Sequence, residues 1–167
     1  PFKPSEYGSV VLPFTVLRRL DAVQADTKES VLATVHGSAD LPETLRHAVL
    51  TKASGREFYN ISRFDFAKLV ADPQDLRQNL AAYIAGFSTN VRDIFERFEF
   101  DKTLDKLAEK NKLFAVAEKF AQADFHPDRV SNIQMGLVFE ELIRWANERS
   151  NETAGDHYTP REVIELM

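Results

Sequence analysis

The sequence predicts an all-α fold, a multi-helix bundle, and three observations support this. Apolar side chains recur every three or four residues along most of the chain, as they do on the buried face of a helix. Capping residues followed by proline, a usual start of a helix, recur along the chain. Strand-like patterns are scarce. With 44% apolar and 28% charged residues, the chain can bury a core of ordinary size.

The first helix is expected over residues 5–25, where Pro13 should kink or restart it because proline lacks a backbone N–H donor. A second helix should follow the cap-and-proline sequence of residues 40–43 and stop at Gly55. The apolar positions of these helices are Val10, Val11, Phe14, Leu17 and Leu20 in the first, and Leu41, Leu45, Ala48 and Val49 in the second.

The middle of the chain should contain several shorter elements. Residues 58–62 are aromatic and β-branched, which predicts a loop or a short extended piece, and residues 64–70 should form a short helix. The longest periodic run starts at residues 72–75, and Gly86 and Ser88 should divide it. Its apolar residues are Leu76, Leu80, Tyr83, Ile84, Phe87, Val91, Ile94, Phe95 and Phe98.

Two short helices should occupy residues 102–109 and 112–123, and a long helix follows them. Ser131 should cap this long helix, and Gln134, three residues later, should complete a capping box. The residues expected on its buried stripe are Ile133, Leu137, Leu142, Ile143 and Ala146, with Phe139 and Trp145 at the edge.

Three phenylalanines crowd the end of the longest periodic run. Phe95 and Phe98 fit the buried stripe and are expected in the core, whereas Phe100 lies off that stripe. Phe100 is therefore predicted to face a partner or another domain, so that Phe100→Ala would leave folding nearly intact and weaken assembly. Trp145 could likewise be either a core residue or a contact with a partner or another domain.

Charge and composition limit the possible functions. A net charge of −5 is unlike that of an autonomous nucleic-acid binder, which is usually basic. The candidate phosphate contacts are pairs or scattered residues, for which a solvated helix face is the simpler interpretation: Arg18, Arg19, Arg46, His47, Lys52, Arg56 and Arg63. The chain has no cysteine and no apolar run long enough to span a membrane, which fits a location in the cytoplasm.

No catalytic or metal site is predicted. Asp124, His126 and Asp128 flank Pro127, and this arrangement favours a turn between helices over a metal site. The other histidines show no ligand spacing. No His or carboxylate residues have the pattern of a nucleophile or of a paired acid and base, which argues against a self-contained enzyme within these residues.

The last residues have the pattern of a helix start. Thr159 can cap the helix, Pro160 fits its first position, and Glu162 completes a capping box. Residues 1–150 are therefore expected to form the helical domain, and residues 151–167 a linker and the first turn of another domain. The backbone N–H groups of a helix start can also bind an anion.

Three blocks of the sequence resemble the modification subunits of type I restriction-modification systems, which are adenine-specific DNA methyltransferases that use S-adenosylmethionine. The first block is residues 86–100 (GFSTNVRDIFERFEF), the second is residues 126–143 followed by 150–155, and the third is residues 155–167 (GDHYTPREVIELM). The blocks occur in the family's order. Before Phe58 the similarity is a general one, to a helical lead-in.

The resemblance implies that the chain is the N-terminal helical domain of such a subunit, truncated at the start of its α/β methyltransferase domain. It implies assembly with a specificity subunit and a second modification subunit, and closure around double-stranded DNA; a restriction subunit is a further possible partner. By position, the family's S-adenosylmethionine contacts correspond to Asp156, His157, Tyr158, Thr159, Pro160 and Arg161, with Tyr158 and Thr159 the strongest candidates.

The other walls of that pocket are missing from the sequence. It contains neither a glycine-rich loop after a strand nor the Asn-Pro-Pro or Asp-Pro-Pro motif that holds a flipped adenine, so these residues alone should be inactive. Two alternatives stay open. One is a stand-alone helical module that binds proteins and not DNA. The other is a different cofactor-dependent enzyme, whose helix start at Thr159 binds another anionic ligand.

Overall fold

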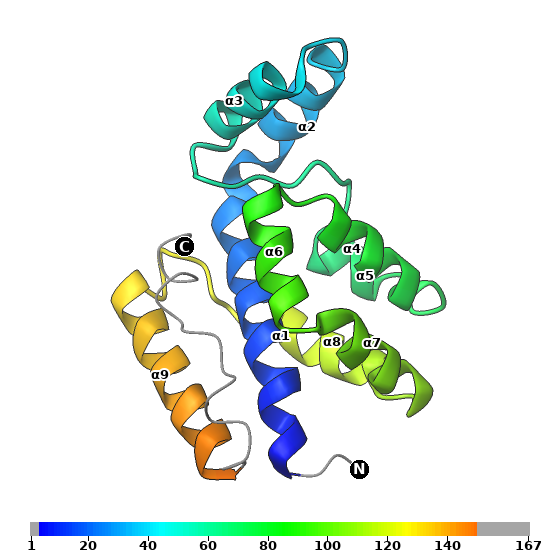
Figure 1. The fold of residues 1–167 in the computed structure, drawn as a ribbon, viewed down its shortest axis with the longest axis vertical. Helices are drawn as coiled ribbons and strands as arrows, with labels where there is room; N and C mark the ends of the chain where they lie inside the picture. The colour runs from blue at the N-terminus through cyan, green and yellow to red at the C-terminus, as the bar shows by residue number, and fades with distance from the viewer. Residues whose placement is uncertain (1–3, 150–167) are drawn as a thin grey trace.

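The computed structural model describes residues 4–149, and their fold is all-α, as the sequence predicts (Figure 1). In chain order the elements are α1 (Pro4–Gln24), the 3-10 turn η1 (Ala25–Thr27), α2 (Lys28–Gly37), α3 (Glu43–Ser54), α4 (Phe66–Val70), α5 (Leu76–Ala85), α6 (Thr89–Arg97), α7 (Phe100–Glu109), α8 (Leu113–Gln122) and α9 (Asn132–Arg149). Within residues 4–149, β structure is limited to one antiparallel bridge, between Asn60 and Phe87. None of the described helices is long and apolar enough to cross a membrane. The predicted boundary at residue 150 lies outside the described residues.

Helix α1 is the axis of the fold. It contacts α7, α8 and α9, with α9 along one side of it and α4 to α8 on the other (Figure 1). The α2–α3 hairpin extends from the end of α1, and its two helices pack mainly against each other (Figure 1). Because α1 is enclosed, apolar residues are buried on several of its sides. They are Val10, Leu12, Phe14, Val16, Leu17, Leu20 and Val23.

Helix α1 continues through Pro13, so the expected restart at this proline is wrong. A proline inside a helix costs stability because the carbonyl four residues earlier loses its N–H donor. That carbonyl belongs to Ser9, and the hydroxyl of Thr103 on α7 donates to it at 3.4 Å. Packing on several sides, together with this donor, keeps α1 continuous where the local sequence favours a break.

The predicted division of the longest periodic run is confirmed. Helix α5 ends at Ala85 and α6 begins at Thr89, so the break falls at Gly86 and Ser88. The predicted stop of α3 is also confirmed, because Gly55 adopts a left-handed conformation with φ of 67° and ends the helix. The two short helices expected at residues 102–109 and 112–123 correspond to α7 and α8.

Phe100 lies in the core, so its predicted exposure to a partner is wrong. Its side chain is only 1% exposed, and its ring centroid lies 5.1 Å from that of Phe14 and 5.4 Å from that of Phe95. The reason is the backbone at Glu99, which has φ of 55° and begins a new helix, α7. This turn changes the direction of the chain and brings Phe100 back to the apolar interior.

The start of α9 is confirmed as a capping box. The backbone N–H of Ser131 donates to Gln134 Oε1 at 2.7 Å, and the backbone N–H of Gln134 donates to Ser131 Oγ at 3.1 Å. The predicted buried stripe is wrong at Ile133 and Leu137, which are 79% and 61% exposed, and is confirmed at Leu142 and Ile143, which pack against the core. The apolar residues that pack inward are Met135, Phe139, Leu142 and Ile143, whereas the side chains of Trp145 and Ala146 lie outside the described residues.

The α2–α3 hairpin differs most from the expectation. Helix α2 is an additional element, in which only Val31 is buried. In α3 the expected apolar face is wrong, because Leu41 just before the helix, Leu45 and Ala48 are exposed and Val49 is only half-buried. The buried residues of the helix are Leu50 and Ser54. A two-helix hairpin that projects from the body can bury only a narrow stripe, which the sequence pattern does not identify.

Candidate functional site

The residues assigned by resemblance to an S-adenosylmethionine pocket, Asp156, His157, Tyr158, Thr159, Pro160 and Arg161, lie outside the described residues. Their assignment therefore stays a prediction. All the candidate phosphate contacts lie inside the described part. The structure separates them into buried structural groups, groups that line a cleft, and exposed groups outside the cleft.

Arg19 is a buried structural side chain. It is fully buried, and its guanidinium donates to Phe125 O at 2.7 Å, to Val130 O at 2.7 Å and to Asn132 Oδ1 at 2.8 Å. Burial lowers the pKa of Arg19, and the positive charge of Arg56 adds to this effect. Both sequence interpretations of Arg19, a phosphate contact and a solvated face, are wrong, since it joins α1 to the α8–α9 connection.

Arg18 belongs to a buried polar cluster that links α1 with α5. Its guanidinium donates to Asp21 Oδ2 at 3.0 Å, Tyr83 Oη donates to Asp21 Oδ1 at 2.6 Å, and Gln24 Nε2 donates to Tyr83 Oη at 3.1 Å. Burial raises the pKa of Asp21, against the hydrogen bond from Tyr83 and the charge of Arg18. Lys28 Nζ is buried without a hydrogen-bond partner in the described structure, and burial lowers its pKa to about 8.

The cavity beside this cluster has a volume of about 250 Å³. Four charged side chains line it: Arg18, Asp21, Lys28 and Asp65. Its formal charges cancel, so it has no electrostatic preference for an anion or a cation. Its polar groups bond within the protein except Lys28 Nζ, which lies 5.7 Å from the ring centroid of Tyr83. We assign the cluster a structural role.

A larger cleft, of about 520 Å³, opens between α3 and the connection from α5 to α6. Two backbone hydrogen bonds hold its floor: Ile61 N–H donates to Gly86 O at 2.8 Å, and Ser88 N–H donates to Tyr59 O at 2.9 Å. The close approach requires glycine at residue 86, because a Cβ there would lie 2.8 Å from Asn60 Oδ1. The lining residues are Glu43, Thr44, Arg46, His47, Leu50, Tyr59, Ile61, Ala85, Gly86, Phe87, Ser88, Thr89 and Arg92.

Positive charge predominates in this cleft. Arg46 comes from α3 and Arg92 from α6, and both guanidinium charges act on Tyr59 between them. Burial raises the pKa of Tyr59, and the charges of Arg46 and Arg92 oppose that rise. The hydroxyl of Tyr59 also lies 2.9 Å from Nδ1 of His47. Glu43 is the one carboxylate among the lining residues.

The start of α6 forms one wall of the cleft. Ser88 precedes the helix but its side chain does not cap it, since Ser88 Oγ donates to Asn90 Oδ1 at 2.7 Å. Arg92 Nη2 donates to Thr89 Oγ1 at 2.9 Å, which holds this guanidinium at the first turn. The first N–H groups of a helix carry partial positive charge, so the helix start adds to the potential of the two arginines.

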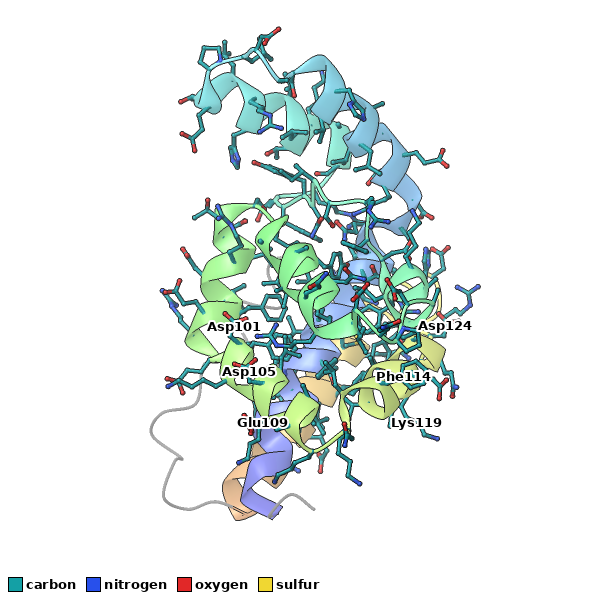
Figure 2. The ribbon with its side chains drawn as sticks, turned by 90° about the vertical axis from the view of Figure 1, so that its right-hand side faces the viewer. Asp101, Asp105, Glu109, Phe114, Lys119 and Asp124 are labelled. Atoms are coloured by element: carbon teal, nitrogen blue, oxygen red, sulfur yellow. The ribbon has the colours of Figure 1, made fainter. Side chains whose placement is uncertain are left out.

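The remaining candidates lie outside the cleft. Lys52 and Arg56 are exposed near the end of α3, and Arg63 is exposed with its guanidinium carbon 4.5 Å from the ring centroid of Phe64. The opposite sign of charge gathers elsewhere: Figure 2 shows Asp101, Asp105 and Glu109 along α7, away from the α2–α3 hairpin. Asp101 and Asp105 pair with Arg77, and Asp101 lines a neighbouring cleft together with Arg92, so the two charged regions adjoin at Arg92.

His126 lies in the predicted turn between α8 and α9, which is confirmed. Its backbone N–H donates to Asp124 Oδ1 at 3.2 Å, and its Nδ1 accepts from the N–H of Asp128 at 3.1 Å. These are bonds within a turn. Among residues 4–149, no group of three or more His, Cys, Asp or Glu residues is arranged to hold a metal ion.

Comparison with known families identifies the domain. The family model described as the HsdM N-terminal domain matches residues 2–120, which include α1 to α7 and most of α8. The chain belongs to this family. HsdM N-terminal domains are the N-terminal domains of modification subunits of type I restriction-modification systems. No curated protein and no solved structure matches the chain. The cleft between α3 and α6 lies entirely within the matched range.

Proposed function

We propose that this HsdM N-terminal domain assembles a type I modification subunit with its partners and closes around double-stranded DNA. The partners are a specificity subunit and a second modification subunit, with a restriction subunit in complexes that also cleave DNA. The full-length subunit transfers a methyl group from S-adenosylmethionine to N6 of adenine. The family match is the observation that carries this proposal.

The positive cleft supports a role beside DNA. The chain as a whole has a net charge of −5, so its contact with DNA must be local. Arg46, Arg92 and the start of α6 supply a local positive potential in the cleft. A few such groups are enough to position a protein on a DNA backbone when partners supply the base contacts.

Within this proposal, Asp156, His157, Tyr158, Thr159, Pro160 and Arg161 form one edge of the S-adenosylmethionine pocket. The catalytic domain supplies the glycine-rich loop and the adenine-binding motif, since residues 1–167 contain neither. Residues 1–167 alone therefore have no methyltransferase activity.

Methyl transfer by the reconstituted complex tests the proposal. The full-length subunit is mixed with its specificity subunit, and transfer of a radiolabelled methyl group to duplex DNA is measured with and without residues 1–149. The proposal requires N6-methyladenine from the intact complex and at least a hundredfold less product without the helical domain. Full activity without the domain, or no methyl transfer by the intact complex, would refute it in favour of a helical protein-interaction module.

A further inference from the structure

We propose that the cleft between α3 and the start of α6 binds one phosphodiester group of the DNA backbone. This inference rests on the proposed function and adds to it a location, a ligand group and the residues that contact that group. Arg46 and Arg92 are the two phosphate-binding side chains. Thr89, at the first position of α6, is placed to supply a backbone N–H.

The guanidinium of Arg46 is not committed to other partners. Among the described residues no hydrogen bond or ion pair involves it, and its Nε is buried without a partner. An unpaired buried donor is unfavourable, and a guanidinium with free donors matches the paired oxygens of a phosphate. In contrast, Arg18 and Arg19 direct guanidinium N–H groups to acceptors inside the protein, and the one buried Nε without a partner in this pair belongs to Arg19, which is fully buried, so both are excluded as phosphate contacts.

The second guanidinium is fixed in position. Arg92 Nη2 donates to Thr89 Oγ1, and the exposed side chain lines both this cleft and the neighbouring one along α6 and α7. Because Ser88 Oγ donates to Asn90 instead of capping α6, the first N–H groups of the helix are not covered by that side chain. Asn90 Oδ1 accepts from the backbone N–H of Val91 at 3.0 Å, which leaves the N–H groups of Thr89 and Asn90, beside two arginines, for an anionic oxygen.

The charges of the cleft match a diester. Arg46 and Arg92 contribute two positive charges and Glu43 one negative charge, which leaves a net of one positive charge. A phosphodiester carries one negative charge, whereas a free phosphate or a phosphate monoester carries more. The hydroxyls of Thr44 and Tyr59 line the same cleft and are donors of the kind that contact backbone phosphates.

The test uses the full-length modification subunit assembled with its specificity subunit. Dissociation constants for a duplex are measured at several salt concentrations for wild type, Arg92→Gln and the double variant Arg46→Gln/Arg92→Gln. Arg63→Gln is the control, because it removes the same charge from an exposed arginine outside the cleft. We expect the double variant to bind about tenfold more weakly at moderate salt. The slope of the logarithm of the association constant against the logarithm of salt concentration should decrease in magnitude by about one for each copy of the domain. The decrease should be equal on cognate and scrambled duplexes.

Glu43→Gln should change the DNA affinity in the opposite direction. Removing this carboxylate should tighten DNA binding several-fold, and a folding defect cannot produce that result. A duplex with single neutral methylphosphonates should lose affinity for wild type at one position for each copy of the domain. The double variant should show no further loss at that position, since the contact is already absent.

The outcomes separate this inference from the proposed function. If wild type neither binds nor methylates DNA, the proposed function fails. If wild type does both, while the cleft variants keep wild-type affinity and salt slope, only this inference fails. Inorganic phosphate is the second probe. If millimolar phosphate binds to the wild-type complex but not to the double variant, while both bind DNA with equal affinity, the cleft binds a free anion. That result overturns the DNA contact.

Discussion

Replacing Arg19 by Met tests the structural account most severely. Arg19 is fully buried in α1, and its guanidinium donates to two backbone carbonyls and one side-chain oxygen around the α8–α9 connection. Met has a similar length and no donors. The substitution therefore removes all three hydrogen bonds while it keeps most of the packing of the side chain.

The expected loss of stability in Arg19→Met follows from the hydrogen-bond acceptors that lose their donor. Hydrogen bonds from a charged donor contribute about 1.5–3 kcal/mol each, and an unpaired buried carbonyl costs about 1–3 kcal/mol. Phe125 O and Val130 O both lose this donor. The loss is reduced because the variant no longer buries a charge, so we expect a net destabilisation of about 3–5 kcal/mol.

Urea unfolding followed by circular dichroism measures this loss, and hydrogen exchange locates it. The free energy of unfolding of Arg19→Met should fall by that amount, with the first loss of amide protection in α9. Arg129→Met is the control: its exposed side chain pairs with Asp124 at 2.7 Å, and its loss should cost less than about 1 kcal/mol. Equal stabilities of the two variants, or unchanged protection of α9, would refute the role of Arg19.

Three further predictions concern residues at which sequence and structure can be compared directly. Phe100→Ala should destabilise the domain by about 3–5 kcal/mol in urea unfolding, because it opens a cavity between Phe14 and Phe95; near-wild-type stability would restore an interface role. Gly86→Ala should lower the melting temperature, since its Cβ would lie 3.0 Å from the backbone nitrogen of Ser62, whereas Gly37→Ala meets open space and should not; equal effects would contradict the close packing. Burial lowers the pKa of Lys28 from 10.5 to about 8, so the unfolded chain binds more protons between these values and stability should rise as pH increases from about 8 to 10. Lys28→Met should reduce that rise, and an identical pH dependence in the variant would exclude a buried ammonium.

Local signals predict those elements whose causes are local. The break at Gly86 and Ser88, the stop at Gly55 and the capping box of Ser131 and Gln134 depend on residues close together in the chain, and the structure confirms each. Helical periodicity likewise predicts the all-α class, since it needs no knowledge of which helices meet.

Long-range packing explains the predictions that fail. Pro13 does not break α1 because α7 supplies a donor to Ser9 O, and this requires knowing that the two helices touch. The prediction for Phe100 is wrong because the left-handed turn at Glu99 begins a new helix, so the periodicity of the preceding helix does not continue to Phe100. The local sequence around Arg19 predicts a surface cation, because the carbonyls that accept its hydrogen bonds lie more than a hundred residues later in the chain.

The candidate site was only partly visible in the sequence. Arg46 and His47 are among the predicted phosphate contacts, but Arg92 is not, because it lies on another helix with nothing beside it to mark it. The backbone pairing of residues 59–61 with 86–88 brings these side chains to one cleft. A pairing between segments that far apart has no signature in a single sequence.

The distance between two copies of the domain in the assembled complex tests the central claim, closure around DNA. Residues 1–167 contain no cysteine, so Ala39→Cys places a single spin label in this domain, at the exposed turn between α2 and α3, once cysteines elsewhere in the subunit are replaced. Pulsed electron spin resonance then measures the distance between the two labels without and with duplex DNA. If the two copies close around DNA, the distance distribution should be shorter and narrower when DNA is bound. An identical distribution with saturating DNA would contradict this closure.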